Sequence, residues 1–426
     1  MIAAIHPSVI LGQLTAPPSK SAMQRACAAA LLCGGETILH QIGRSNDDLA
    51  ALEMIMALGA HAEPVGENSL RIVSNGVQPK EQILHCGESG LGLRMFTPIA
   101  AISALPLRMT GAGTLLQRPM HFFDEVLPRL GVSVKSNEGK LPLDIQGPLR
   151  PATIEIDGSL SSQFLTGLLM AYSAVNASDI TIHATNLKSK PYVDLTLDIM
   201  AAFGMKLPLQ QDYEIFTFQE ALPENKPTQR SYQVEGDWSG AAFLLVAGAI
   251  AGEINVVGLN TKSKQADKAI LEALYKANAR LKVTNTSLEV SKSNLKAFHF
   301  DATECPDLFP PLVVLAAYAE GTSSISGISR LVHKESNRAI TLQEEFRKLE
   351  VIIHLRGDEM LIEGGGSIQG AVLHSHHDHR IAMAAAVAGL GATSAIVIKD
   401  ADAIGKSYPH FFEDLKKLGT SVSLSI

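Results

Sequence analysis

The chain has 426 residues, of which 46% are hydrophobic and 19% are charged, so its length suits two domains with buried cores. Its formal net charge of −7 argues against a general binder of nucleic acid or of membrane surfaces. Four scattered cysteines without C-x-x-C spacing, an N-terminal stretch without a basic region or cleavage motif, and apolar runs too short for a bilayer predict a cytoplasmic protein with reduced thiols.

A unit of about 72 residues recurs six times along the chain. Each copy contains a small, almost wholly apolar helix, expected to start near Lys20, Ser89, Ser161, Trp238, Pro306 and His379. A second, amphipathic helix follows, expected near Asp47, Met120, Val193, Asp267, Ala339 and His410. A short β-type run separates the two helices, and a hairpin-like pair of strands follows the second helix in five copies. The last copy is expected to be truncated after residue 418.

The apolar helices predict the layering of the fold. A helix that is hydrophobic on nearly every side must be buried, so the sheets are expected to lie outside the helices. The alternative is a linear solenoid, but such proteins have shorter repeats and polar capping ends. Six units can divide as three and three. The polar, proline-containing segment at 222–230 is expected to be a loop near a crossing between domains.

Cations and hydroxyl groups gather where the helices begin. The strongest example is Pro17 to Ser21, which leads into Arg25. A helix start offers free N–H groups and a positive dipole end, which favour phosphate or carboxylate, although an ordinary helix cap with solvated cations is the alternative. Gly87 to Gly90 precedes Arg94 in the same way, and its spacing is not a dinucleotide fingerprint.

The other helices repeat this arrangement. Their starts carry Ser161, Ser162, Gln163, Asp307, Asp378 and Arg380 in the first series, and Arg118, Ser189, Tyr192, Lys334, Glu335, Arg338 and Lys406 in the second. Each residue alone could be a cap, a solvated charge or a snorkelling side chain. Their shared placement in a net-acidic chain predicts a site for anionic ligands.

The histidine-rich tract at 374–379 raises the question of a zinc site. No second cluster of histidine or cysteine at ligand spacing supports it. We expect no metal and no cofactor.

Ten segments carry a combined pattern: PPSKS with Arg25, GESGLGLR, TGAGTLLQRP, DGSLSSQF, KSKPYVDLTL, VEGDWSGAAF, CPDLF, HKESNR, HDHRIAM and GKSYP. In this order, over essentially the full length, they closely resemble the 5-enolpyruvylshikimate-3-phosphate (EPSP) synthases, or 3-phosphoshikimate 1-carboxyvinyltransferases. The resemblance implies a two-domain, inside-out α/β barrel built from six βαβαββ repeats, with helices buried and sheets outside. It places residues 14–234 in the first domain, and 1–13 with 235–426 in the second. The active site would lie in the cleft between them.

The resemblance also implies the reaction. The carboxyvinyl group of phosphoenolpyruvate passes to the 5-hydroxyl of shikimate 3-phosphate through a tetrahedral intermediate, and phosphate leaves, in the biosynthesis of chorismate and aromatic amino acids. Matching positions imply that shikimate 3-phosphate is bound by Lys20, Ser21, Arg25, Ser161, Ser162, Gln163, Ser189, Tyr192, Asp307 and Lys334. They imply that phosphoenolpyruvate is bound by Lys20, Gly90, Arg118, Gln163, Arg338, Arg380 and Lys406.

Two polyanionic substrates must be held together, and concentrated positive charge can do this without a metal. Asp307 is the candidate base for the substrate hydroxyl. Lys20 or Glu335 is the candidate acid for the methylene carbon, and neighbouring cations are expected to lower the pKa of Lys20. The expected partners are these two small molecules alone, with no nucleic acid and no membrane, acting on a monomer.

The chain departs from the family pattern at Glu88, Leu91 and Arg330, where asparagine, threonine and asparagine are frequent. These changes put glyphosate sensitivity and the outer shikimate contacts in doubt. The nearest rival family is the UDP-N-acetylglucosamine enolpyruvyl transferases. Their loop cysteine or aspartate is absent from 111–119 here. A non-catalytic anion-binding repeat protein would not explain Asp307 with Glu335, and the acidic balance disfavours an RNA-end enzyme.

Overall fold

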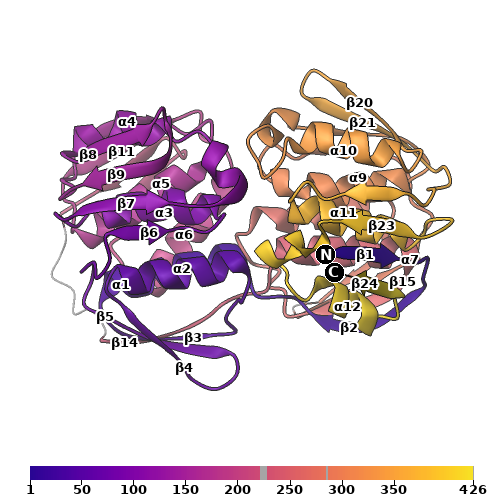
Figure 1. Cartoon of the computed structure of the whole chain (residues 1–426), viewed down its shortest axis with the longest axis horizontal. Coiled ribbons are helices and arrows are strands. Elements are labelled where there is room, and N and C mark those ends of the chain that lie inside the picture. Colours follow the sequence, from indigo (N-terminus) through magenta and orange to yellow (C-terminus); the bar gives the residue numbers. More distant parts are fainter. Residues whose placement is uncertain (221–227, 285, 426) are drawn as a thin grey trace. The chain divides into compact units, whose positions relative to one another are not determined.

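The computed structural model describes residues 1–220, 228–284 and 286–425. The chain forms two compact units, one made of Pro18–Val234 and the other of Met1–Pro17 with residues 235–426 (Figure 1). Within the expected loop at 222–230, residues 222–227 lie outside the described residues, and Gln229 already belongs to a strand. Among the residues that are described, no helix is long and apolar enough to cross a membrane.

The Pro18–Val234 unit surrounds three buried helices, α1 (Lys20–Cys33), α3 (Gly90–Ala100) and α5 (Ser162–Ala174). The second helix series is α2 (Asn46–Ala57), α4 (His121–Val126) and α6 (Lys190–Ala202), with the 3-10 helices η1 (Gly113–Gln117) and η2 (Leu127–Leu130). Its three sheets, in strand order, are β14 (Gln229–Gln233), β3 (Gly35–His40), β5 (Ser69–Ser74), β4 (His61–Pro64); β6 (Ile83–His85), β7 (Pro106–Thr110), β9 (Lys140–Gln146), β8 (Ser133–Asn137); and β10 (Ile154–Asp157), β11 (Ile180–Thr185), β13 (Ile215–Phe218), β12 (Leu209–Gln211).

The other unit repeats this plan around α7 (Trp238–Ala251), α9 (Phe309–Ala317) and α11 (His379–Gly389). Its second series is α8 (Ile270–Lys276), α10 (Arg338–Arg347) and α12 (Phe411–Lys417), with η3 (Ala266–Ala269), η4 (Pro306–Leu308), η5 (Ile328–Leu331) and η6 (Ala401–Lys406). Its sheets, in strand order, are β2 (Ile10–Thr15), β15 (Gly252–Val257), β17 (Ser287–Ser291), β16 (Arg280–Val283); β18 (His299–Asp301), β19 (Gly321–Ser326), β21 (Glu359–Gly364), β20 (Ile352–Arg356); and β22 (Val372–His374), β23 (Ile396–Lys399), β1 (Ile2–Ile5), β24 (Val422–Ser425).

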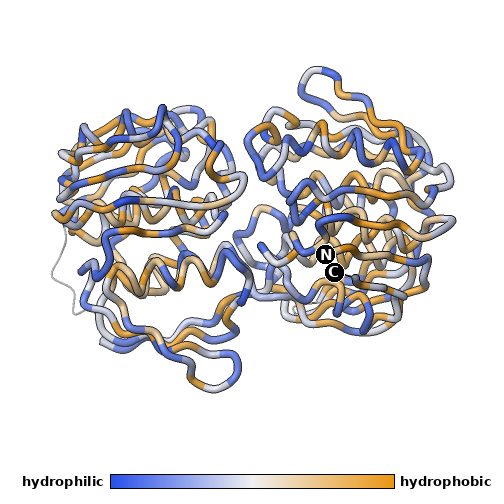
Figure 2. Tube along the Cα trace, in the orientation of Figure 1, coloured by the Kyte–Doolittle hydropathy of each residue, from blue (hydrophilic) through white to orange (hydrophobic). Residues whose placement is uncertain are grey.

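All six sheets have one design. The first two strands are parallel, and the remaining pairings are antiparallel. Hydrophobic residues alternate with polar ones along these strands, as the changes of colour in Figure 2 show, because one face of each sheet covers the buried helices. The expected inside-out α/β arrangement of six repeats is therefore confirmed.

The buried helices form because each begins at a capping side chain and then carries small apolar residues. Ser19 Oγ accepts a hydrogen bond from the Ala22 N–H at 3.3 Å, and Asp237 Oδ2 accepts one from the Gly240 N–H at 3.0 Å. Every residue of α7 is buried. Such a helix gains its stability from packing on all sides, so it lies at the centre of its unit.

Two strands lie in sheets that the sequence order does not suggest. Strand β2 precedes α1 in the chain, yet it pairs with β15 of the other unit, and β14 precedes α7 yet pairs with β3. The β2 pairing runs as far as Thr15 with Val257. For that reason the division falls at Pro17, a few residues after the boundary expected at residue 14.

The sixth repeat is complete, contrary to the expected truncation. Strand β1 supplies the missing strand and pairs antiparallel with both β23 and β24, with Ile2 opposite Lys399 and Ser425. The two ends of the chain therefore meet in one sheet (Figure 1). The sequence gave no local sign of this, because the pairing joins segments about 400 residues apart, beyond any local periodicity.

Candidate active site

The start of α1 holds Lys20 against an acidic residue of α2. Lys20 Nζ lies 2.8 Å from Asp47 Oδ2, and both side chains are largely buried. The sequence argument placed neighbouring cations beside Lys20, whereas the structure places the Asp47 carboxylate there. This ion pair fixes the direction of the Lys20 side chain.

One turn further along α1, Arg25 is buried among neutral oxygens. Its guanidinium donates to the Ser21 carbonyl at 2.8 Å, to Thr196 Oγ1 at 2.9 Å and to the Tyr192 carbonyl at 3.5 Å. It also lies over the Tyr192 ring at 5.8 Å from the centroid. Burial lowers the pKa of Arg25 to about 10, so the group is still a cation at neutral pH. The structure thus brings Arg25, Ser21 and Tyr192 together.

Two arginines converge on the start of α3. A Cβ added at Gly90 would lie 2.6 Å from Arg118 Nη1 and 3.6 Å from Arg94 Nη1. Arg94 Nη1 donates to Gln163 Oε1 at 3.0 Å, and its guanidinium lies over the Phe164 ring at 5.1 Å. Only glycine leaves room for Arg118 at this position. Gly90, Arg118 and Gln163, predicted separately from sequence, therefore share one corner of this unit.

The predicted serines lie at the starts of α5 and α6. Ser161 caps α5, and its Oγ accepts a hydrogen bond from the Gln163 N–H at 3.2 Å. Ser162 is buried in the first turn. Ser189 is the residue before α6 and has a left-handed backbone with φ of 56°, which is uncommon outside glycine and asparagine. These hydroxyl groups stand where the first N–H groups of two helices are available.

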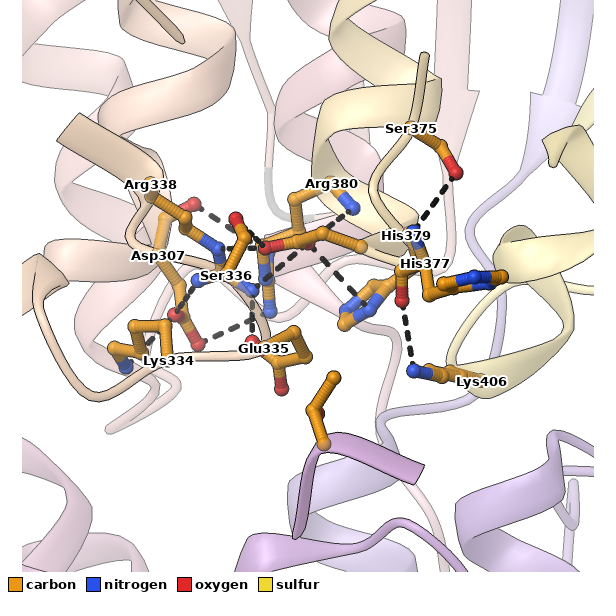
Figure 3. Close-up of polar contacts among 12 residues, drawn as sticks. Asp307, Lys334, Glu335, Ser336, Arg338, Ser375, His377, His379, Arg380 and Lys406 are labelled. Carbon is orange, nitrogen blue, oxygen red and sulfur yellow. Dashed lines mark hydrogen bonds and ion pairs between the residues drawn. The ribbon is translucent and has the colours of Figure 1, made fainter. Parts of the chain in front are cut away.

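In the unit formed by 1–17 and 235–426, Arg338 is the centre of an ionic network (Figure 3). Its Nε lies 2.8 Å from Asp378 Oδ2, its Nη1 lies 2.8 Å from Asp307 Oδ1, and its Nη2 also contacts Glu335. Arg338 and Asp378 are almost fully buried. These carboxylates hold the arginine in one orientation and raise its pKa above the usual value, against the effect of burial.

Asp307 receives positive charge from three sides. Lys334 Nζ lies 3.0 Å from its Oδ1, and Arg380 Nη2 lies 3.1 Å from its Oδ2, in addition to the Arg338 contact. Burial alone would raise the pKa of Asp307, but these cations hold it well below its usual range. Asp307 is therefore ionised and accepts hydrogen bonds through both oxygens.

A second buried acid lies in the same electrostatic environment. Ser239 Oγ donates to Asp267, which is fully buried in η3. Burial, followed by repulsion from Asp307, raises the pKa of Asp267 to about 7. Adjacent carboxyl groups of this unit thus have pKa values displaced in opposite directions.

Lys406 and the histidine tract lie together on the side of α11 that faces η6. Lys406 Nζ donates to the His377 carbonyl at 2.7 Å, while His374 and His377 both contact Asp400, at 3.1 and 3.4 Å. His376 contacts Glu345 at 2.9 Å. No group of three histidine, cysteine, aspartate or glutamate residues that could hold a metal ion occurs in the part of the chain that the structure describes.

Sequence reasoning missed two acidic partners. Asp47 and Asp378 stand at helix starts, where an acidic residue has an ordinary explanation as a cap or as a favourable charge for the helix dipole. In the structure they hold Lys20 and Arg338. Both observations were present in the sequence, since each acid lies at the start of a helix neighbouring a predicted cationic residue.

The comparisons with known proteins agree with this geometry. The family profile described as EPSP synthase (3-phosphoshikimate 1-carboxyvinyltransferase) matches residues 6–415. The chain belongs to the EPSP synthase family. Two similar relatives, both named 3-phosphoshikimate 1-carboxyvinyltransferase, come from Aeropyrum pernix, at 37% identity over 98% of this chain and 96% of the relative, and from Clostridium novyi, at 34% identity over 97% of each.

Solved structures extend the family match to the fold. An EPSP synthase from Acinetobacter baumannii superposes with a TM-score of 0.82 at 24% identity, covering 99% of this chain and 100% of that chain. An enolpyruvyl transferase from Streptomyces tendae superposes with a TM-score of 0.79 at 18% identity, covering 99% and 98%. The inside-out architecture is thus shared with enolpyruvyl transferases.

Proposed function

We propose that this EPSP synthase family member transfers the carboxyvinyl group of phosphoenolpyruvate to the 5-hydroxyl of shikimate 3-phosphate and releases phosphate. The observation that carries the proposal is the full-length family match, combined with buried cations at the helix starts of both units. The reaction belongs to the biosynthesis of chorismate and aromatic amino acids. It requires no metal and no cofactor, and we propose a cytoplasmic monomer.

The proposed shikimate 3-phosphate site draws first on the Pro18–Val234 unit. Arg25 has neutral partners, so its charge is available to the carboxylate of the ligand. The hydroxyl groups and first N–H groups of α5 and α6 suit a phosphate. The proposed ligands from this unit are Lys20, Ser21, Arg25, Ser161, Ser162, Gln163, Ser189 and Tyr192, and the other unit contributes Asp307 and Lys334.

The proposed phosphoenolpyruvate site uses arginine and lysine in different roles. Arginine can bind a carboxylate through two parallel hydrogen bonds, and lysine provides a point charge for phosphate. We assign the carboxylate to Arg338 and Arg380. We assign the phosphate to Lys20, Arg118, Lys406 and the Gly90 N–H, with Gln163 between the two substrates.

Binding to Arg338 requires an exchange of partners. Asp307, Glu335 and Asp378 already occupy its donors. Asp378 is fully buried, whereas the Glu335 side chain keeps 16% of its surface exposed. A substrate carboxylate would therefore displace Glu335 at the lowest cost, and this would release Glu335 beside the reacting carbons.

The chemistry needs two proton transfers in the addition step. The 5-hydroxyl oxygen bonds to the second carbon of phosphoenolpyruvate while Asp307 takes its proton, and Lys20 or Glu335 gives a proton to the methylene carbon. Loss of phosphate and of one methyl proton then restores the vinyl group. The three cations around Asp307 make it a weak base at rest, so its basicity would rise only as substrates draw these cations away.

A test of acceptor choice addresses this proposal. The purified protein is given phosphoenolpyruvate with either shikimate 3-phosphate or UDP-N-acetylglucosamine, and phosphate release is measured. Release with shikimate 3-phosphate supports the proposal. Release with the nucleotide sugar alone, or with neither acceptor, would overturn it.

A further inference from the structure

The segment that carries Arg118 is attached to the residues that open α3. The Cys86 N–H donates to the Thr110 carbonyl at 2.9 Å, and the Ala112 N–H donates to the Gly87 carbonyl at 2.8 Å. These bonds continue the parallel pairing of β6 with β7 beyond the last strand residues. The segments at 86–90 and 110–118 therefore move together as far as residue 112.

Beyond residue 112, the Glu88 side chain lies against the second segment. A Cβ added at Gly113 would lie 2.1 Å from Glu88 Oε2 and 2.9 Å from Glu88 Oε1. Gly113 also has a φ of 55°, which other residues rarely adopt. The carboxylate thus rests on the Gly113 α-carbon at the first turn of η1, where backbone N–H groups lack partners within the helix.

The rest of η1 connects Gly113 to Arg118. The Arg118 N–H donates to the Leu115 carbonyl at 3.2 Å, and Arg118 Nη2 donates to Thr114 Oγ1 at 3.4 Å. Its other terminal nitrogen lies above Gly90. A displacement of the first turn of η1 would therefore displace the guanidinium from the start of α3.

We propose that Glu88 is a positioning residue that holds the 113–118 segment and thereby keeps Arg118 over Gly90. Glu88 and Gly113 act as a matched pair, since the carboxylate occupies the volume that any larger residue at 113 would need. This inference rests on the proposed function, in which Arg118 and Gly90 bind the phosphate of phosphoenolpyruvate. It explains how this chain accommodates glutamate where the family pattern has asparagine.

A double-mutant cycle tests the pairing. Glu88→Ala and Gly113→Ala should each raise the KM for phosphoenolpyruvate by at least about threefold, with a smaller change in kcat and with the KM for shikimate 3-phosphate nearly unchanged. The double variant should lose less than the product of the two single effects, because Glu88→Ala removes the collision at 113. Glu88→Gln keeps the shape of the side chain and should retain more affinity than Glu88→Ala.

A matched control separates backbone strain from the collision. Gly66 also has a positive φ, of 71°, but nothing lies within 4 Å of an added Cβ. Gly66→Ala should therefore leave both KM values close to those of the unchanged protein. Multiplicative effects of the two substitutions at 88 and 113, or equal rises in both KM values, would overturn the proposal.

A second readout does not depend on activity. Hydrogen exchange of residues 113–118 should accelerate in Glu88→Ala while exchange in α1 stays unchanged. Unchanged exchange at 113–118 would contradict the inference, even for a protein that turns over its substrates. A protein without turnover but with accelerated exchange would contradict the proposed function and leave the positioning role supported.

Discussion

The two units hold their buried cations in contrasting ways. Arg338 is surrounded by the carboxylates of Asp307, Glu335 and Asp378, whereas Arg25 donates to the Ser21 and Tyr192 carbonyls and to a threonine hydroxyl. The first arrangement neutralises its charge within the protein. The second leaves the charge to be neutralised by something else.

This difference indicates how each unit would respond to an anion. A ligand at Arg25 gains a new ionic contact, so binding there should be strong and simple. A ligand at Arg338 must replace an internal carboxylate, so binding there is coupled to a rearrangement of charged side chains. The contrast suits an order in which one anion binds first and the second completes the network.

The largest expected effect is loss of turnover from either unit. Lys20→Ala and Asp307→Asn should each lower kcat by about 10²- to 10⁴-fold, because each removes a group proposed to transfer a proton or to orient one. The measurement is steady-state phosphate release, with circular dichroism to show that the variants are folded. Near-normal turnover in one variant would locate the chemistry in the other unit alone.

The next effect concerns stability and tests the contrast directly. Arg338→Met leaves buried carboxylates without their main partner and should cost about 3–5 kcal/mol of unfolding free energy. Arg25→Met leaves neutral groups that lose a hydrogen bond and should cost about 1–3 kcal/mol. Urea unfolding of both variants provides the comparison. Equal losses would show that the carboxylates around Arg338 do not distinguish the two units.

The pH dependence of stability should have opposite signs at two aspartates. Burial raises the pKa of Asp48, the residue that completes the capping box of α2 with Ser45, from 3.8 to about 6. Its contribution is therefore present at low pH and is lost as the pH rises from about 4 to 6. Asp48→Asn should gain stability relative to the unchanged protein over this window, by at most about 3 kcal/mol.

Asp307 provides the opposite case and the control. Its pKa is lowered, so its contribution is present above the usual carboxyl pKa and is lost as the pH falls. Asp307→Asn should therefore be least harmful at acidic pH. Urea midpoints measured between pH 4 and pH 8 test both variants, and parallel curves for the two would contradict this account.

The smallest effect is expected at the one ion pair described here at the start of α1. Asp47→Asn removes the carboxylate that directs Lys20 and should cost about 1 kcal/mol in stability, with a several-fold loss in kcat. Kinetics and thermal unfolding measure the two quantities. A loss as large as that of Lys20→Ala would place Asp47 in the chemistry rather than beside it.

Local signals predicted the helices better than the strand partners. Ser19, Ser89 and Asp378 announce helix starts through side chains that cap their own helices, and these caps are present in the structure. The pairings of β2 and β14 join segments far apart in sequence, so no periodicity within either segment could reveal them. The repeat was visible, but the exchange of its first strand between units was not.

The same limit applies to the charged groups. The cations were predictable because each lies near a helix start, whereas the role of Asp47 and Asp378 as their partners depends on which helices pack together. Glu88 was noticed as a departure from the family pattern, but its approach to Gly113 depends on the fold of the 111–118 segment. The ligands that the cations bind are still predictions.

Product analysis tests the central claim most directly. Carbon-13-labelled phosphoenolpyruvate is mixed with shikimate 3-phosphate and the purified protein, and carbon and phosphorus NMR follow the label and the released phosphate. The account predicts a new vinyl ether carbon signal that grows in equal amount with inorganic phosphate. Phosphate release with pyruvate in place of the vinyl ether, or an unchanged spectrum, would contradict it.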